Sequence, residues 1–355
     1  MTSPQIYPEI QIDLDAIVAN WRRLEALSGA RATPVVKADG YGLGADRIVK
    51  ALQNAGADIF YVAYAFEGEA LRISLGAGPE IRVFHGVSPA EIDVFRAHDL
   101  TPVLNSLDQI QAWAAISDGR KPVLHIDTGM NRLGLAKSDT ASIAERIEPI
   151  AIMSHLACAD DASNPMNARQ LSEFLNVAQA FPGVPRSLSA SAGALLGREY
   201  GLDEIRPGIG LHGGGPRPAS GPDLTQAATL TAPILQIRAI SPDETSGYGA
   251  TFSPEAPAML ACASIGYADG LLRTGSNKGY AMVQGQRRPI VGRISMDLTM
   301  IDITGLDTKI GEPVVFFGPD LPIREQADAF GTIDYELLTS LGGRVKRTYT
   351  GGAAG

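Results

Sequence analysis

From Ala32 to about Gly213, short apolar runs alternate with longer stretches in which apolar residues recur at helical spacing. Each run ends in a polar or glycine-rich turn, and amphipathic segments such as 44–56 and 106–117 follow. This alternation predicts parallel βα units. The candidate strands are 33–40, 59–66, 81–87, 101–106, 121–129, 150–157, 186–192 and 204–213. Eight successive units favour a closed (β/α)8 barrel over an open doubly wound sheet.

After Pro216 the pattern changes. Residues 215–226 are rich in Pro, Gly and Ser and predict a linker or long loop. Short alternating segments separated by turn residues then predict a mainly-β domain, with a helical run only at 323–343. These segments are 233–240, 258–268, 281–294, 298–304 and 312–318. We therefore expect a barrel over residues 1–227 and a β domain over 228–355, and the residues up to about 10 are candidates to pair with the β domain.

The composition is that of a globular protein, because 45% of the 355 residues are hydrophobic and 19% are charged. The net charge is -9, and the absence of a basic run excludes nucleic acid as an expected partner. No apolar stretch approaches the roughly 20 residues of a membrane helix, and the first residues lack the pattern of an export signal. Cys158 and Cys262 fit neither a metal site nor a disulfide framework. We expect a cytoplasmic protein.

In a parallel barrel, functional residues lie at the C-terminal ends of the strands. The polar residues at those ends are Lys37, Tyr41, Arg132, His155, Ser191 and Arg206. Lys37 closes an apolar run, so burial of its stem would favour the neutral amine that forms a Schiff base. A solvated lysine is the competing interpretation, and the local sequence leaves both open.

The segment 204–213 carries glycines that allow backbone N–H groups to approach a phosphate. A flexible turn explains the same glycines. A lysine and a phosphate cradle on one barrel suggest pyridoxal phosphate. His155 alone is more typical of a core histidine, and no other histidine lies at metal-ligand spacing from it, so we expect no metal.

Three short motifs in the β domain contain candidate residues. Tyr248 lies between two glycines in "SGYGATF", Tyr267 lies in "SIGYADG", and Met296 and Asp297 lie in "GRISMDLTM". Tyrosines in turns are usually packing or rim residues, so none of these motifs identifies a site by itself.

Taken together, the motifs resemble those of bacterial alanine racemases. They are "VVKADGYGLG", "DTGMNRLG", "SHLACAD", "SAG", "RPGI", "GYGATF", "IGYADG" and "GRISMD", and they occur in the family's order over nearly the whole chain. The resemblance implies a fold-type III pyridoxal 5'-phosphate enzyme that interconverts L- and D-alanine. It also implies a head-to-tail homodimer with shared active sites, supplying D-alanine for peptidoglycan or for alanine catabolism.

The resemblance further implies a role for each candidate. Lys37 resembles the lysine that holds the cofactor as an internal aldimine and acts as base on the D enantiomer. Tyr248 of the partner subunit resembles the opposite base, which acts on the L enantiomer. The remaining implied contacts are Tyr41, Ser191, Gly208 and Ile209 at the phosphate, His155 beside the ring, Arg206 at the pyridine nitrogen, Arg132 at the cofactor hydroxyl and substrate carboxylate, Met296 at the substrate, and Tyr267 and Asp297 at the entrance.

Three positions depart from the family pattern. His125 stands where the best-known relatives carry a carbamylated lysine, so chloride or the histidine itself would have to replace that anion, or the anion is absent. His212 replaces a common tyrosine. Gly343 occupies the place of a phosphate-contacting tyrosine, which leaves one phosphate contact in doubt. Tyr41 would then contribute a larger share of the phosphate binding.

Two other classes of function remain open at this point. One is a related pyridoxal phosphate enzyme, either a racemase of serine, lysine or arginine or a decarboxylase. Decarboxylases of this architecture would lack the paired bases Lys37 and Tyr248. The other is a non-catalytic pyridoxal phosphate-binding barrel, which would lack the β domain that carries Tyr248.

Overall fold

The structure is a computed structural model that describes residues 6–115, 117–216 and 223–352. The chain divides into two compact units, Ile17–Leu224 and Met1–Ala16 with Thr225–Gly355. The linker expected at 215–226 falls largely on residues 217–222, which lie outside the described residues. No helix in the described ranges is both long and apolar enough to cross a membrane.

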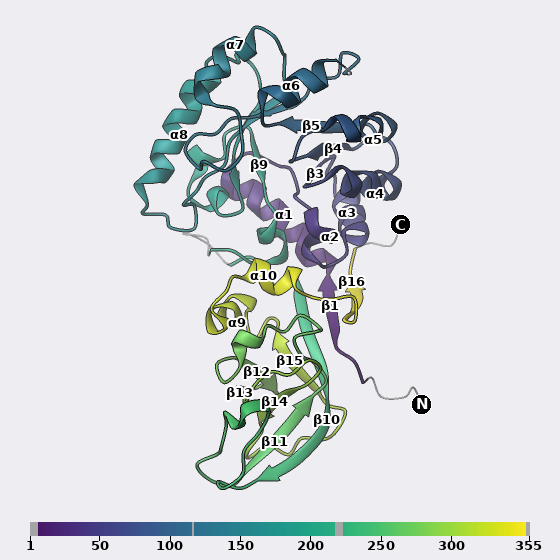
Figure 1. Cartoon of the computed structure of the whole chain (residues 1–355), viewed down its shortest axis with the longest axis vertical. Helices are drawn as coiled ribbons and strands as arrows, with labels where there is room; N and C mark the ends of the chain where they lie inside the picture. Colours follow the sequence, from purple (N-terminus) through teal and green to yellow (C-terminus); the bar gives the residue numbers. More distant parts are fainter. Residues whose placement is uncertain (1–5, 116, 217–222, 353–355) are drawn as a thin grey trace. The chain divides into compact units, whose positions relative to one another are not determined.

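The unit Ile17–Leu224 is the expected (β/α)8 barrel (Figure 1). Its parallel strands follow the order β2-β9-β8-β7-β6-β5-β4-β3. A parallel bridge between Val35 and Tyr61 joins the two ends of this order and closes the barrel. The strands are β2 (Arg31–Ala32), β3 (Ile59–Val62), β4 (Glu80–Val83), β5 (Leu100–Leu104), β6 (Val123–His125), β7 (Ala151–Met153), β8 (Arg186–Ala190) and β9 (Glu204–Arg206).

Helices follow the strands, as the alternating pattern predicts. They are α3 (Ala45–Asn54), α4 (Ala65–Leu75), α5 (Ile92–Ala97), α6 (Leu107–Ala114), α7 (Thr140–Ala144) and α8 (Pro165–Ala178), preceded by α1 (Leu14–Ser28). The short element α2 (Lys37–Tyr41) differs from these, because its backbone is left-handed from Ala38 to Tyr41. The helix α3 shows the sequence basis clearly, because its buried residues Ile48, Val49 and Leu52 recur at helical spacing.

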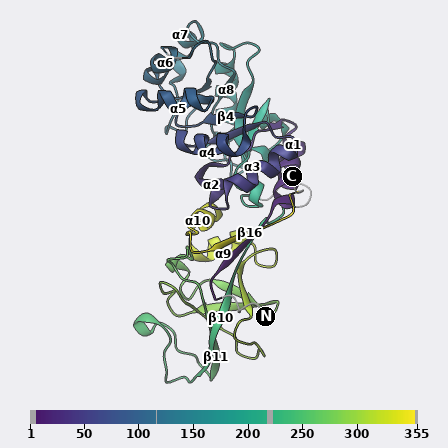
Figure 2. The same cartoon turned by 90° about the vertical axis from the view of Figure 1, so that its right-hand side faces the viewer.

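The second unit is the mainly-β domain, through which the long strand β10 runs (Figure 2). Its sheet has the order β11-β14-β13-β12-β15-β10-β1-β16, and β11 also pairs with β10. The first strand of the chain pairs here with β10 and β16. The elements are β1 (Glu9–Asp13), β10 (Ala228–Ile240), β11 (Ala258–Ala263), β12 (Tyr280–Val283), β13 (Gln286–Val291), β14 (Thr299–Asp302), β15 (Pro313–Phe317), α9 (Ile323–Phe330), α10 (Asp334–Thr339) and β16 (Lys346–Thr350).

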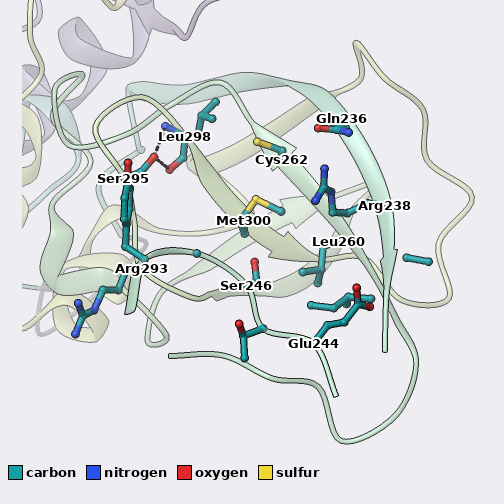
Figure 3. Close-up of a pocket in the computed structure, with 15 residues that line it drawn as sticks. Gln236, Arg238, Glu244, Ser246, Leu260, Cys262, Arg293, Ser295, Leu298 and Met300 are labelled. Carbon is teal, nitrogen blue, oxygen red and sulfur yellow. Dashed lines mark hydrogen bonds between the residues drawn. The ribbon is translucent and has the colours of Figure 1, made fainter. Parts of the chain in front are cut away.

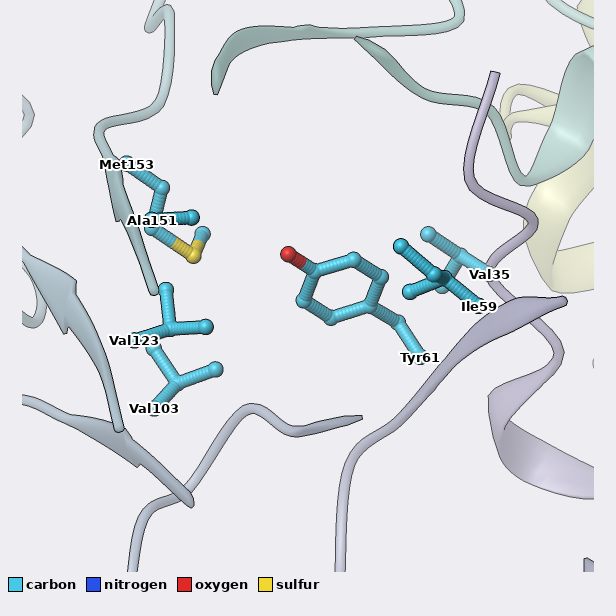
Figure 4. Packing of buried hydrophobic residues seen from close by; sticks show 7 residues of the cluster. All are labelled: Val35, Ile59, Tyr61, Val103, Val123, Ala151 and Met153. Atoms are coloured by element: carbon cyan, nitrogen blue, oxygen red, sulfur yellow. The ribbon is translucent and has the colours of Figure 1, made fainter. Parts of the chain in front are cut away.

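The barrel interior combines an apolar cluster with a buried ion pair. Tyr61 lies in an apolar cluster whose other members are Val35, Ile59, Val103, Val123, Ala151 and Met153 (Figure 4). The Tyr61 hydroxyl accepts a hydrogen bond from Arg82, whose guanidinium also donates to Glu204 at 2.8 Å. Both charged side chains are almost fully buried, so each depends on the other for its charge to be tolerated.

The Glu204→Ala variant should therefore destabilise the barrel by about 3 kcal/mol, because it leaves the buried Arg82 with Glu80 as its one remaining carboxylate partner among the described residues. Asp203→Ala is the matched control, since Asp203 pairs with Arg186 at the surface and should cost about 1 kcal/mol or less. Urea denaturation followed by tryptophan fluorescence measures both values, because the chain's two tryptophans, Trp21 and Trp113, lie in the barrel. Equal losses of unfolding free energy in the two variants would show that the buried ion pair stabilises the barrel no more than the surface pair does.

Candidate active site

The predicted strand 33–40 is wrong, because β2 already ends at Ala32 and only Val35 adds an isolated bridge before the chain enters a left-handed turn after Lys37. Ala38, Asp39 and Gly40 have φ values of 52°, 53° and 62°, and Tyr41 has 61°. Left-handed backbone costs a residue with a side chain roughly 1–2 kcal/mol, so this turn is strained at three positions. Hydrogen bonds from Gly40 N to Val36 O and from Gly42 N to Ala38 O close it.

Hydrogen bonds to two carboxylates connect this turn to neighbouring elements. The Asp39 carboxylate accepts from Ala45 N at 2.8 Å, which caps α3. The Glu67 carboxylate accepts from Ala38 N at 2.7 Å. These bonds hold a conformation that the local sequence does not favour.

The amine of Lys37 lies partly desolvated at the mouth of the barrel. Its Nζ is 5.7 Å from the centre of the Phe84 ring. Burial lowers the pKa of Lys37, the Arg132 charge lowers it further, and the Glu67 charge opposes both. The neutral, nucleophilic form of Lys37 is therefore more populated than in a solvated lysine.

The segment after β9 forms a backbone cradle against Ser191. Ser191 Oγ accepts from Gly208 N and from Gly210 N, each at 3.0 Å. These two bonds occupy both lone pairs, so the Ser191 hydroxyl proton is left to be donated elsewhere. Within the described ranges the Ile209 N–H also has no acceptor. Two donors thus remain for an anion.

Tyr41 lies against this cradle. A Cβ atom at position 208 would stand 1.8 Å from the Tyr41 hydroxyl oxygen, so only glycine fits there. Burial raises the pKa of Tyr41, which keeps it a neutral phenol that can donate a hydrogen bond. The structure therefore brings Tyr41, Ser191, Gly208 and Ile209 together.

Arg206 is fully buried in the barrel. Its guanidinium donates to Ser187 Oγ and to the carbonyl oxygens of Ser154 and Leu188. Burial lowers its pKa to about 10, so it stays protonated at neutral pH. His155 is half-buried, and burial and the charge of Arg206 lower its pKa to about 3, so it is neutral.

Arg132 lies exposed in the loop after β6. The carboxylate of Asp127 fixes this loop by accepting from the backbone N–H groups of Gly129, Met130 and Asn131 at 2.9 Å each. A parallel bridge between Ile126 and Leu135 closes its base. Because Arg132 lowers the pKa of both Lys37 and His155, its charge acts on the group of residues at the barrel mouth.

His125 is held in one tautomer by Asn105. The Asn105 amide nitrogen donates to Phe84 O at 2.9 Å and to Val103 O at 2.7 Å. These carbonyls fix the amide orientation, so the 2.8 Å contact with His125 Nδ1 joins that nitrogen to the amide oxygen. Nδ1 must therefore carry the proton. Burial and the charges of Arg206 and Arg132 lower the pKa of His125 to about 4. Nε2 is thus unprotonated at neutral pH and can accept a hydrogen bond.

Nitrogen NMR of histidine-labelled protein should show His125 as the neutral Nδ1–H form from pH 8 down to about pH 5, with its resonance assigned by a His125→Gln variant. In the Asn105→Asp variant a carboxylate replaces the amide, and it should raise the pKa of His125 because it favours the imidazolium. A native His125 protonated at Nε2 alone would contradict the assigned tautomer.

The other two departures from the family pattern are His212 and Gly343, and their surroundings are defined in the structure. His212 is fully buried beside Tyr41, with the two rings 5.3 Å apart between centres, and burial lowers its pKa to about 3. Neither ring nitrogen has a hydrogen-bond partner within the described part of the chain. A side-chain atom at Gly343 would meet open space, so nothing there replaces the missing tyrosine.

In the β domain, Tyr248 lies at the surface with 72% of its area exposed. It borders a cavity of about 580 Å³, into which Figure 3 shows Arg238, Cys262 and Met300 projecting from β10, β11 and β14. Gly247 and Gly249 flank it with positive φ, so the tyrosine stands on a tight turn.

Tyr267, Met296 and Asp297 form a second group in this domain. Backbone bonds from Tyr267 N to Ser295 O and from Ala268 N to Met296 O, both 3.0 Å, join their loops. Arg344 pairs with Asp297 at 2.8 Å and with buried Asp269 at 3.1 Å, which fixes the pair of loops. The candidates thus fall into a barrel group and a β-domain group.

Two residues of this region, Glu67 and Asn105, were not among the predicted site residues. Glu67 had a local signal, because it is the third residue of α4, where an acidic side chain can accept from the N–H at the helix start, as Glu67 does from Tyr64 N. Asn105 had none, since its partner His125 is 20 positions away.

The fold and site define a two-domain protein in which a (β/α)8 barrel presents a desolvated lysine and an anion cradle and is joined to a β domain. Residues 12–216 match the family model for the alanine racemase N-terminal domain, and residues 227–349 match that for the C-terminal domain. The chain belongs to the alanine racemase family.

Individual relatives agree along nearly their full length. The alanine racemases of Jannaschia sp. and Dinoroseobacter shibae are each 43% identical, over 96% and 97% of this chain and 98% and 99% of their own. The crystal structure of Bartonella henselae alanine racemase with covalently bound pyridoxal phosphate is similar, with 36% identity and a TM-score of 0.91 over 98% of this chain and 100% of that chain. The biosynthetic alanine racemase of Pseudomonas aeruginosa has 32% identity, the same TM-score and the same two coverages.

Proposed function

We propose that this protein is an alanine racemase that uses pyridoxal 5'-phosphate to interconvert L- and D-alanine. The observation that carries the proposal is the desolvated amine of Lys37 on a barrel whose anion cradle is built from Ser191 and the segment after β9. Family membership over both domains supports it. A barrel that only binds the cofactor is not favoured, since it needs no β domain, and the similarity to alanine racemases favours alanine over another amino acid as substrate.

The barrel residues fit this cofactor. A phosphate needs donors, and the Ser191 hydroxyl and Ile209 N–H supply them, while Gly208 leaves room beside Tyr41. Arg206 would face the pyridine nitrogen and His155 the ring. Because Arg206 stays protonated, it cannot accept a proton, and it has none to give up readily near neutral pH. Arg132 would contact the cofactor hydroxyl and the substrate carboxylate.

Racemisation requires proton transfer on both faces of the substrate's α carbon. The bound cofactor withdraws electrons from that carbon and so acidifies its proton. Lys37 would remove or return the proton on one face, and its lowered pKa suits this task. Tyr248 would do the same on the other face, while Met296 N–H would hold the substrate and Tyr267 and Asp297 would line the entrance.

We further propose that the enzyme works as a head-to-tail homodimer in the cytoplasm. A catalytic tyrosine needs shielding from water, yet Tyr248 is exposed beside an open cavity in its own chain, and a second copy would cover it. The free thiols of Cys158 and Cys262 fit a reducing compartment.

The function is tested by chiral chromatography of single amino acids incubated with the purified protein and pyridoxal 5'-phosphate. We expect L- and D-alanine to interconvert much faster than serine, lysine or arginine. A panel is needed because a pocket distinguishes one methylene group by only about 1–3 kcal/mol. Racemisation of serine or lysine at the rate of alanine would overturn the substrate assignment.

The shared site predicts complementation between inactive variants. Lys37→Ala and Tyr248→Phe should each lose at least roughly 100-fold in turnover, because each lacks one base. Refolded mixtures should recover up to about a quarter of the native activity, because half of the dimers at random pairing are hybrids with one intact site of two. Each variant refolded alone is the control. Mixtures that stay inactive would contradict a site built from both subunits.

A further inference from the structure

Glu67 links the loops that follow two neighbouring strands of the barrel. It is a half-buried residue in the first turn of α4, after β3. Its Oε2 accepts from Ala63 N at 2.8 Å and from Tyr64 N at 3.1 Å, which caps its own helix. Its Oε1 accepts from Ala38 N at 2.7 Å, in the turn that begins at Lys37.

We propose that Glu67 is a positioning residue for Lys37: through Ala38 N–H it holds the left-handed turn and sets the direction in which the reactive lysine leaves the barrel wall. This inference deepens the proposed function and rests on it. The hydrogen bond acts at the first residue with positive φ, where the chain departs from ordinary backbone. Without it, Ala38 has a strained conformation and no partner for its N–H.

The carboxylate also acts on the lysine through its charge. Glu67 raises the pKa of Lys37, against the lowering by burial and by Arg132. Glu67 thus fixes the orientation of the Lys37 amine and limits the lowering of its pKa.

Glutamate suits this task and glutamine does not. Three backbone N–H groups converge on the two carboxylate oxygens. An amide offers a single acceptor oxygen, and its NH2 group would face an N–H donor. In Glu67→Gln the oxygen should stay with Ala63 and Tyr64, where two bonds are made, and Ala38 should lose its acceptor.

The test compares holoenzymes of Glu67→Gln and Glu69→Gln. Glu69 lies on the same helix but pairs with His98 at the surface, so it is the matched control. We expect Glu67→Gln to lower kcat by roughly 10- to 100-fold, as misplacement of a catalytic group does, with KM for alanine changed less. Hydrogen exchange by mass spectrometry should become faster in peptides covering 36–44 and stay slow in those covering 57–66. Glu69→Gln should match the native enzyme.

A rescue variant separates orientation from general damage. Glycine adopts positive φ without strain, so Ala38→Gly should restore most of the kcat lost in Glu67→Gln. Unchanged exchange over 36–44 in Glu67→Gln, or a double variant no faster than Glu67→Gln, would overturn the orienting role. If the native enzyme does not racemise alanine, the proposed function fails, and the exchange comparison still decides whether Glu67 holds the turn.

Discussion

The left-handed turn from Ala38 to Tyr41 is the constraint on which the barrel's chemistry depends. It follows β2 and the bridge at Val35, leaves Lys37 at the barrel mouth and places Tyr41 against Gly208. Because three of its residues carry side chains, its strain must be offset by bonds from elsewhere. Asp39 supplies one of these bonds from inside the turn, and Glu67 supplies another from the first turn of α4.

The charges at the barrel mouth favour the neutral amine of Lys37, while Arg206 stays protonated at neutral pH. Burial and Arg132 favour the neutral form of Lys37. His155 and His125 are held neutral by burial and the same cations, so they act as hydrogen-bonding groups and not as charges. Beneath them, Arg82 and Glu204 neutralise each other. The buried Arg206 is stabilised by Ser187 Oγ and the carbonyl oxygens of Ser154 and Leu188, and by the charge of Glu204.

Much of this fold follows from periodicity in the sequence. Each of the eight barrel strands overlaps or adjoins a predicted run. The reason is clear in β3 and β7, because buried parallel strands are continuous apolar segments in the sequence. The turn at 38–41 does not follow, since its strained backbone depends on Glu67, 29 positions from Ala38. The strand β16 was also missed, because "KRTYT" has no apolar alternation and is a strand only through its pairing with β1. The residues that orient the site, Glu67 and Asn105, depend on tertiary contacts in the same way.

The central claim is that Lys37 is the residue that holds the cofactor. Borohydride reduction of the holoenzyme fixes the bond between an amine and a carbonyl, and tryptic mass spectrometry then locates it. We expect the added pyridoxyl mass at Lys37 alone, with loss of visible absorbance in equal measure. A label on any other lysine, or none on a protein that still racemises alanine, would contradict it.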